Sequence, residues 1–168
     1  MMDPPLILGK ESVMLHIAKV LKLKAVDSMS PAALSLRRRD HWESREQAAE
    51  LLRPKGFYQE FDAQCFDDYI RYALTDDSLR GGVELTIPKM TEVEIFRTNP
   101  SLWWMPQAKP MIPVEMLIAS KGPFLKMRFP QKAQKKFGTP FQVFEGSHMF
   151  PLEHPVEVAE KIKTLLLQ

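Results

Sequence analysis

The pattern of apolar and polar positions is clearest in the last third of the chain. Residues 112–119, IPVEMLIA, form a mostly apolar run that predicts a short, buried strand, ended by the Lys-Gly-Pro turn at 121–123. Residues 139–144, TPFQVF, predict a second strand. Between them, residues 124–137 are basic and partly helical in pattern, and we expect Pro130 to interrupt that helix.

A further helix is predicted after the second strand. Pro155 suits the first turn of a helix. Apolar residues then recur at the three-to-four spacing of one helix face, at Val158, Ile162, Leu165 and Leu166. The order strand, helix, strand, helix is typical of a parallel sheet with covering helices, so the predicted fold class is α/β.

The rest of the chain has a mostly helical pattern. Ser44 opens a Ser-Arg-Glu-Gln capping box that predicts a helix to about residue 53, and Asp62 can cap another. Residues 1–6 resemble the end of a strand, residues 11–23 predict a helix, and a short extended piece is expected at 83–87. We expect three parts: residues 1–30, the end of a core strand and a connecting helix; 31–108, a helical cap; and 109–168, a C-terminal α/β core segment.

Composition narrows the class of protein. The chain has 168 residues, 45% of them apolar and 26% charged, which fits one globular domain or a core with a small cap. A net charge of +2 argues against a nucleic-acid partner. The one cysteine, Cys65, excludes an internal disulfide and a thiolate metal cluster, and it favours a reducing compartment such as the cytoplasm. No apolar run is long enough to predict a membrane span.

The order of elements in the C-terminal third resembles the end of an α/β-hydrolase. The strand IPVEMLIAS, a helix, the strand TPFQVFEGS, a histidine and then EHPVEVAEKI follow that family's closing order. The stretch from LRRRDHWESREQ to TEVEIF is similar to the helical cap of one subgroup. The resemblance implies part of an α/β-hydrolase sheet plus a helical cap, and descent from a serine-type hydrolase of esters or similar small apolar substrates, with no cofactor and no metal.

The chain also departs from that family's pattern. The nucleophile of the family lies in Gly-x-Ser-x-Gly, a strained strand-to-helix turn, and this motif occurs nowhere in the sequence. The sequence therefore leaves enzymatic activity open. The alternative function is that of a truncated or degenerate hydrolase acting as an interaction protein. A sheet without the family's first strands would expose an unpaired edge, so we also expect possible self-association through that edge.

His148 is the candidate catalytic base that the resemblance implies. A serine hydroxyl becomes a good nucleophile when an imidazole accepts its proton, and a histidine on a loop after a strand is well placed to do so. The alternative is a histidine with no catalytic role. His154 is a rival six residues later, although its place before Pro155 favours a part in starting the helix.

The candidate acid is Asp3. The family's usual acid follows the strand IPVEMLIAS, but Ser120, Lys121 and Gly122 occupy that position here. Some α/β-hydrolases take their acid from the preceding strand, and Asp3 fits that position. An Asp-Pro turn without a catalytic role is the alternative. If Asp3 is the acid, its carboxylate should approach a ring nitrogen of His148 to about 3 Å.

Two adjacent tryptophans are candidates for substrate binding. Trp103 and Trp104 could line an apolar substrate pocket, or they could simply pack one part of the chain against another. The basic stretch LRRRDHW favours a solvated surface over an anion site. Glu153 and His154 provide two potential metal ligands without a third, so no metal site is expected.

Overall fold

The computed structural model describes residues 1–167, which divide into two compact units. Unit 1 comprises residues 1–37 and 90–148. Unit 2 comprises residues 38–89 and the described residues from 149 onward. In the described part of the chain, no helix combines the length and apolar character needed to cross a membrane.

Unit 1 contains a parallel pair of strands. Strand β4 (Met116–Ala119) lies beside β5 (Phe141–Phe144), with Met116 opposite Phe141. The prediction that IPVEMLIA and TPFQVF are neighbouring parallel strands is confirmed. Both strands are shorter than predicted. Each predicted run includes a proline near its start, and a proline has no N–H to donate to a strand ladder.

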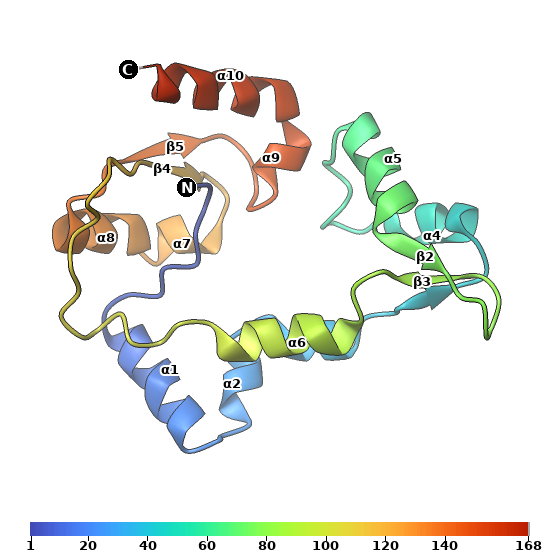
Figure 1. The fold of residues 1–168 in the computed structure, drawn as a ribbon, viewed down its shortest axis with the longest axis horizontal. Helices are drawn as coiled ribbons and strands as arrows, with labels where there is room; N and C mark the ends of the chain where they lie inside the picture. Colours follow the sequence, from blue (N-terminus) through green and yellow to red (C-terminus); the bar gives the residue numbers. More distant parts are fainter. Residues whose placement is uncertain (168) are drawn as a thin grey trace. The chain divides into compact units, whose positions relative to one another are not determined.

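The N-terminal segment runs parallel to β4 on the other side from β5. Met2 forms an isolated parallel bridge with Leu117. The backbone N–H of Asp3 donates to the carbonyl of Leu117 at 2.7 Å, and the N–H of Leu117 donates to the carbonyl of Met1 at 2.9 Å. Figure 1 shows the N-terminus beside β4. This pairing places Asp3 next to the carboxyl-terminal half of β4.

Two helices connect β4 to β5 and cover one face of the strands. They are α7 (Pro123–Lys126) and α8 (Phe129–Phe137), both close to the strands in Figure 1. The expected interruption at Pro130 is wrong: Pro130 lies in the first turn of α8, where no N–H is required. The break falls just before α8, at Arg128, whose φ of +58° is left-handed.

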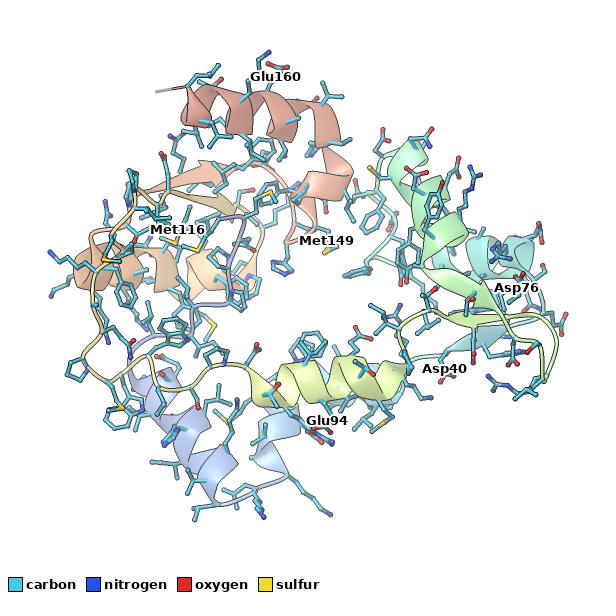
Figure 2. All side chains as sticks on the ribbon, in the orientation of Figure 1. Asp40, Asp76, Glu94, Met116, Met149 and Glu160 are labelled. Carbon is cyan, nitrogen blue, oxygen red and sulfur yellow. The ribbon has the colours of Figure 1, made fainter. Side chains whose placement is uncertain are left out.

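The core of unit 1 lies between these helices and the strands. Met116, labelled in Figure 2, is buried there. The buried members of this cluster are Leu8, Met116, Ile118, Phe129 and Ala133. Because Leu8 comes from the N-terminal segment, the same cluster fixes that segment against β4. Hydrophobic burial and the backbone pairing therefore both fix the position of Asp3 beside β4.

Four more helices complete unit 1 or lead into it. They are α1 (Lys10–Val20), α2 (Ala25–Ser28), α3 (Ala32–Leu36) and α6 (Lys89–Thr98), of which α6 starts at the boundary residue Lys89. The helix predicted over 11–23 corresponds to α1, which ends three residues earlier. Arg97 of α6 donates to both carboxylate oxygens of Asp27 in α2, at 2.7 and 2.8 Å, and so ties the two helices together.

Unit 2 combines helices with a small antiparallel sheet that the sequence did not predict. Strands β1 (His41–Trp42), β2 (Leu74–Asp76) and β3 (Val83–Leu85) pair in the order β1-β3-β2. Strands of two or three residues are too short to show the alternation that marks a strand. Only β3 falls within a predicted extended piece. The expectation of a mostly helical block with one extended piece is therefore incomplete, because β1 and β2 were not predicted.

The predicted helix starts in unit 2 are confirmed. Helix α4 (Arg45–Leu52) is capped by the Ser44 hydroxyl, which accepts from the N–H of Gln47. Helix α5 (Ala63–Tyr72) is capped by Asp62, whose carboxylate accepts from two backbone N–H groups.

The end of the described chain is helical. Helix α9 (Phe150–Glu153) precedes α10 (Pro155–Leu166), which begins at Pro155 as predicted. Val158 is buried, as its place on the apolar face requires. Leu166 was expected on the same face, but it is 80% exposed at the last residue of the helix, so the apolar face does not stay buried to its end.

Candidate functional site

A buried carboxylate and a histidine from opposite ends of the sequence meet in unit 1. Asp3 Oδ2 lies 2.7 Å from His148 Nδ1. Asp3 is only 1% exposed, whereas the His148 side chain is half exposed. The expected approach of Asp3 to His148 is confirmed. An imidazole held by a buried carboxylate and open to solvent on its other side can accept a proton from a bound hydroxyl or water.

The backbone at Asp3 is held in an unusual conformation. Its φ is +35°, in the left-handed region that L-residues other than asparagine and aspartate seldom adopt. The strand-like bonds to β4 fix the main chain, and Asp3 Oδ1 accepts from the N–H of Ala119 at 3.2 Å. The carboxylate thus has one oxygen bound to the strand and the other to the imidazole. A strained residue fixed in this way is a typical feature of functional sites.

The loop after β4 closes tightly around the carboxylate. Gly122 leaves space that a side chain would fill: a Cβ there would lie 3.0 Å from the Cβ of Ala119 and 3.1 Å from Asp3 Oδ2. Phe124, at the start of α7, presents its ring edgewise to the imidazole of His148, with centroids 5.5 Å apart. The ring excludes water from one side of the imidazole and limits its rotation.

A small polar network positions the loop that carries His148. The Ser120 hydroxyl donates to Glu145 at 2.8 Å and accepts from the N–H of Gly146 at 3.2 Å. The N–H of Lys121 donates to the carbonyl of Gly146 at 3.0 Å, and its ammonium pairs with Glu145 at 3.1 Å. Ser120 and Lys121 stand where the family's usual acid would be. Here they join the ends of β4 and β5 instead of supplying a carboxylate.

The hydrogen bond to Asp3 determines which imidazole nitrogen can act as a base. An ionised carboxylate only accepts hydrogen bonds, so Nδ1 of His148 carries the proton that it shares with Asp3. In the neutral imidazole, Nε2 is then the unprotonated nitrogen. No described residue forms a hydrogen bond with Nε2. This orientation is the one that a general base in a hydrolytic triad requires.

The two tryptophans line a pocket that does not include this pair. A pocket of about 360 Å³ in unit 1 is formed mainly by Trp103, Trp104, Leu8, Val13, Lys132 and Lys136. Neither Asp3 nor His148 belongs to its lining. Trp103 also packs edgewise on Phe137 of α8, so it has a structural contact besides its place at the pocket. A role for these tryptophans in substrate binding remains a prediction.

The other candidate residues from the sequence lie outside the Asp3–His148 pair. His154 is the residue between α9 and α10. Burial raises the pKa of the Cys65 thiol, and the neighbouring Asp62 and Asp68 raise it further, which disfavours a reactive thiolate. Within residues 1–167, no group of three or more histidine, cysteine, aspartate or glutamate side chains could hold a metal ion.

Comparison with known proteins gives information on the fold. No family model matches the sequence, and no curated protein matches it. Among solved structures, the crystal structure of E-2-(acetamidomethylene)succinate hydrolase matches with a TM-score of 0.66 over 99% of this chain, at 13% sequence identity. The chain spans 56% of that structure's length. At this identity the likeness concerns the fold alone: the chain has a partial α/β-hydrolase fold.

Sequence reasoning found the acid–histidine pair but missed what surrounds it. Asp3 and His148 were proposed because the resemblance to α/β-hydrolases implied a base and an acid at those places, and spacing alone does not show their contact. Ser120 and Glu145 gave no signal, because a serine and a glutamate after two strands are ordinary surface residues. Lys132 and Lys136 belong to a generally basic helix, and nothing in the sequence separates them from Lys135.

Proposed function

We propose that this chain carries the base and the acid of a serine-type hydrolase that acts on esters or similar small apolar substrates. His148 is the base, and Asp3 is the acid that orients it. The hydrogen bond between Asp3 and His148 Nδ1 at 2.7 Å supports this assignment most directly. The partial α/β-hydrolase fold agrees with it. The nucleophile is not assigned to any residue of this sequence.

The absence of Gly-x-Ser-x-Gly from the sequence supports a second candidate. In this alternative, the chain is a degenerate, non-catalytic hydrolase that serves as an interaction protein, and the Asp3–His148 pair is inherited structure. The two candidates agree about the chain in isolation and differ about its natural context. Sequencing the natural transcript separates the two candidates. Codons for Gly-x-Ser-x-Gly in frame upstream of Met1 would favour the serine-type hydrolase, and an in-frame stop codon directly upstream would favour the non-catalytic interaction protein.

The chain alone should not hydrolyse a p-nitrophenyl ester by a serine mechanism. Loss of a triad member typically lowers the rate by several orders of magnitude, and one donor of the family's oxyanion hole is the N–H that follows the nucleophile. We expect no serine to be labelled by a fluorophosphonate probe, as measured by intact mass. Ester turnover should be the same in the wild-type chain, His148→Ala and the control His154→Ala.

Two results together would contradict this expectation. They are stoichiometric labelling of one serine, and loss of both labelling and turnover in His148→Ala but not in His154→Ala. That outcome would show that the chain contains a complete active site. Peptide mapping of the labelled serine would then identify the nucleophile.

A further inference from the structure

The pocket beside Trp103 and Trp104 has a lining that combines aromatic surface with positive charge. Four of its side chains are apolar, namely Leu8, Val13 and the two tryptophans, and two are lysines of α8. Lys132 and Lys136 are four residues apart, so they project from the same side of the helix. A volume of about 360 Å³ lies within the range of small-molecule sites.

The charge of one of these lysines is already neutralised. Lys132 Nζ lies 3.1 Å from Glu11 Oε2 and donates to the carbonyl of Leu8 at 3.3 Å. The N–H of Glu11 itself, and then Lys132, hold the pKa of the Glu11 carboxyl below its usual range, so this glutamate is ionised at neutral pH. Lys132 therefore closes one side of the pocket as a member of an ion pair.

Lys136 differs from Lys132 because it has no counter-charge. Its ammonium donates to two backbone carbonyls, those of Trp103 and Met105, the latter at 2.7 Å. An ammonium has three N–H donors, so one remains. No described carboxylate forms an ion pair with it. The pocket thus has one uncompensated positive charge, held in place by the same loop that carries the tryptophans.

Trp103 contributes apolar surface to the pocket but no accessible hydrogen-bond donor. Its indole Nε1 is buried and has no hydrogen-bond partner within residues 1–167. Because a water molecule cannot reach this nitrogen, an oxygen of a ligand in the pocket cannot approach it to hydrogen-bond distance either. The single ammonium charge of Lys136 matches the charge of one carboxylate. The adjoining indole and aliphatic surfaces match a flat apolar body.

We propose that this pocket binds small aromatic monocarboxylates. The carboxylate is bound by the remaining N–H of Lys136, and the aromatic body lies against Trp104, Leu8 and Val13. Because neither Asp3 nor His148 lines the pocket, the binding site does not require that His148 be catalytic.

The test compares two probes of the same shape. Isothermal titration of the full chain with 1-naphthoate and with the neutral 1-naphthamide should show naphthoate binding about tenfold tighter, because only the acid has a charge for Lys136. Lys136→Gln should remove this preference and leave naphthamide affinity nearly unchanged. Lys135→Gln is the matched control: it removes the same charge from the neighbouring, exposed position of α8, so the preference should persist.

Further variants separate this proposal from its alternatives. Trp104→Ala should weaken both probes by a similar factor, whereas His148→Ala should change neither. Equal affinity of the wild-type chain for the two probes would overturn the proposal, as would the absence of binding. An equal loss of preference in Lys135→Gln and Lys136→Gln would also overturn it, since it would mean that general positive charge attracts the acid. The wild-type comparison stands even if one variant fails to fold.

Discussion

Asp3 combines a strained backbone with a fully satisfied carboxylate. At φ +35° the main chain is less stable than in an extended strand, by an amount on the order of 1–2 kcal/mol for a residue in the left-handed region. The bonds to Leu117, Ala119 and His148 offset that cost. A position that needed only an Asp-Pro turn would not require them. The local geometry therefore favours a functional role for Asp3 over a purely structural one.

The first prediction concerns the tautomer of His148. In the wild-type chain at neutral pH, neutral His148 should carry its proton on Nδ1, because the Asp3 carboxylate can only accept. In Asp3→Asn the amide N–H₂ can donate to Nδ1, so the proton should move largely to Nε2. Long-range ¹H–¹⁵N correlation spectra of the ring nitrogens measure this directly.

His41 provides an internal control for the same spectra. Its Nε2 lies 2.7 Å from the carbonyl oxygen of Gly81, which accepts only, so its proton should stay on Nε2 in both proteins. An unchanged tautomer of His148 in Asp3→Asn would show that the contact with Asp3 does not orient the imidazole. The acid would then have to be reassigned.

The second prediction concerns Gly122. In Gly122→Ala the new Cβ would meet Ala119 Cβ at 3.0 Å and Asp3 Oδ2 at 3.1 Å, and Ala119 belongs to the rigid strand β4. The loop or the carboxylate must therefore move. We expect a loss of stability of about 1–3 kcal/mol, as in other overpacked sites, together with a weaker Asp3–His148 bond. Chemical denaturation and the tautomer spectra of His148 measure the two effects.

Gly56→Ala is the matched control for that variant. No atom lies within 4 Å of a Cβ built at Gly56, so this substitution should change stability little and should leave His148 unaffected. If Gly122→Ala were as stable as Gly56→Ala and kept the wild-type spectrum, the tight packing around Asp3 would have no influence on the site.

At the scale of elements, the sequence predicted regular structure where local signals and burial agree. The caps Ser44 and Asp62 start their helices as expected, because a side-chain cap is a local interaction. The parallel pair β4–β5 was predicted because both strands are mostly apolar runs and a helix lies between them. Strands β1 and β2 were missed, since two or three residues carry no period and their pairing depends on partners distant in sequence.

The third prediction concerns the link between α2 and α6. The hydrogen bonds from Arg97 hold the pKa of the Asp27 carboxyl below its usual range. A lowered folded-state pKa means that the pair stabilises the fold above the ordinary aspartate pKa of about 3.9, and that this contribution is lost as pH falls through the lower folded value. Arg97→Met should therefore lower Tm at pH 7, by roughly 1–3 °C for a partly exposed pair.

The pH dependence distinguishes this pair from a simple packing effect. The difference in Tm between the wild-type chain and Arg97→Met should shrink as pH falls below about 4, where Asp27 of the unfolded chain becomes protonated, and it should vanish once pH has passed the lower pKa of Asp27 in the folded wild-type chain. Glu94→Gln is the control: it removes the second partner of Arg97, at 2.8 Å, and keeps Asp27. A Tm difference that stayed constant down to pH 2 would mean that the charge of Asp27 is not what links the helices.

At the scale of the whole molecule, the order of elements predicted the α/β class, and the resemblance to α/β-hydrolases implied the partial hydrolase fold. The predicted order of the last third agrees with the structure because each of its strands and helices has its own local sequence signal. The division into two units did not follow from the sequence, because each unit is assembled from two separate stretches of chain. Contacts between distant stretches, such as Asp62 N–H to the carbonyl of Leu152, leave no pattern along the chain.

The last prediction is that the chain self-associates through the free edge of β5. Within the described residues, β5 pairs with β4 on one side only, and Val143 in its middle is 53% exposed. An exposed apolar edge strand offers unpaired N–H and C=O groups to another strand, and a lysine on such an edge is a known protection against pairing. Sedimentation velocity from low to high micromolar concentration should show a rising average mass for the wild-type chain and a much smaller rise for Val143→Lys.

Val156→Lys is the control: it adds the same charge at a residue that is 71% exposed on α10. It therefore tests for net charge repulsion, and this variant should associate like the wild-type chain. A wild-type chain that stays monomeric throughout would show that the β5 edge is protected, and equal suppression by both lysines would assign the effect to net charge instead of the edge.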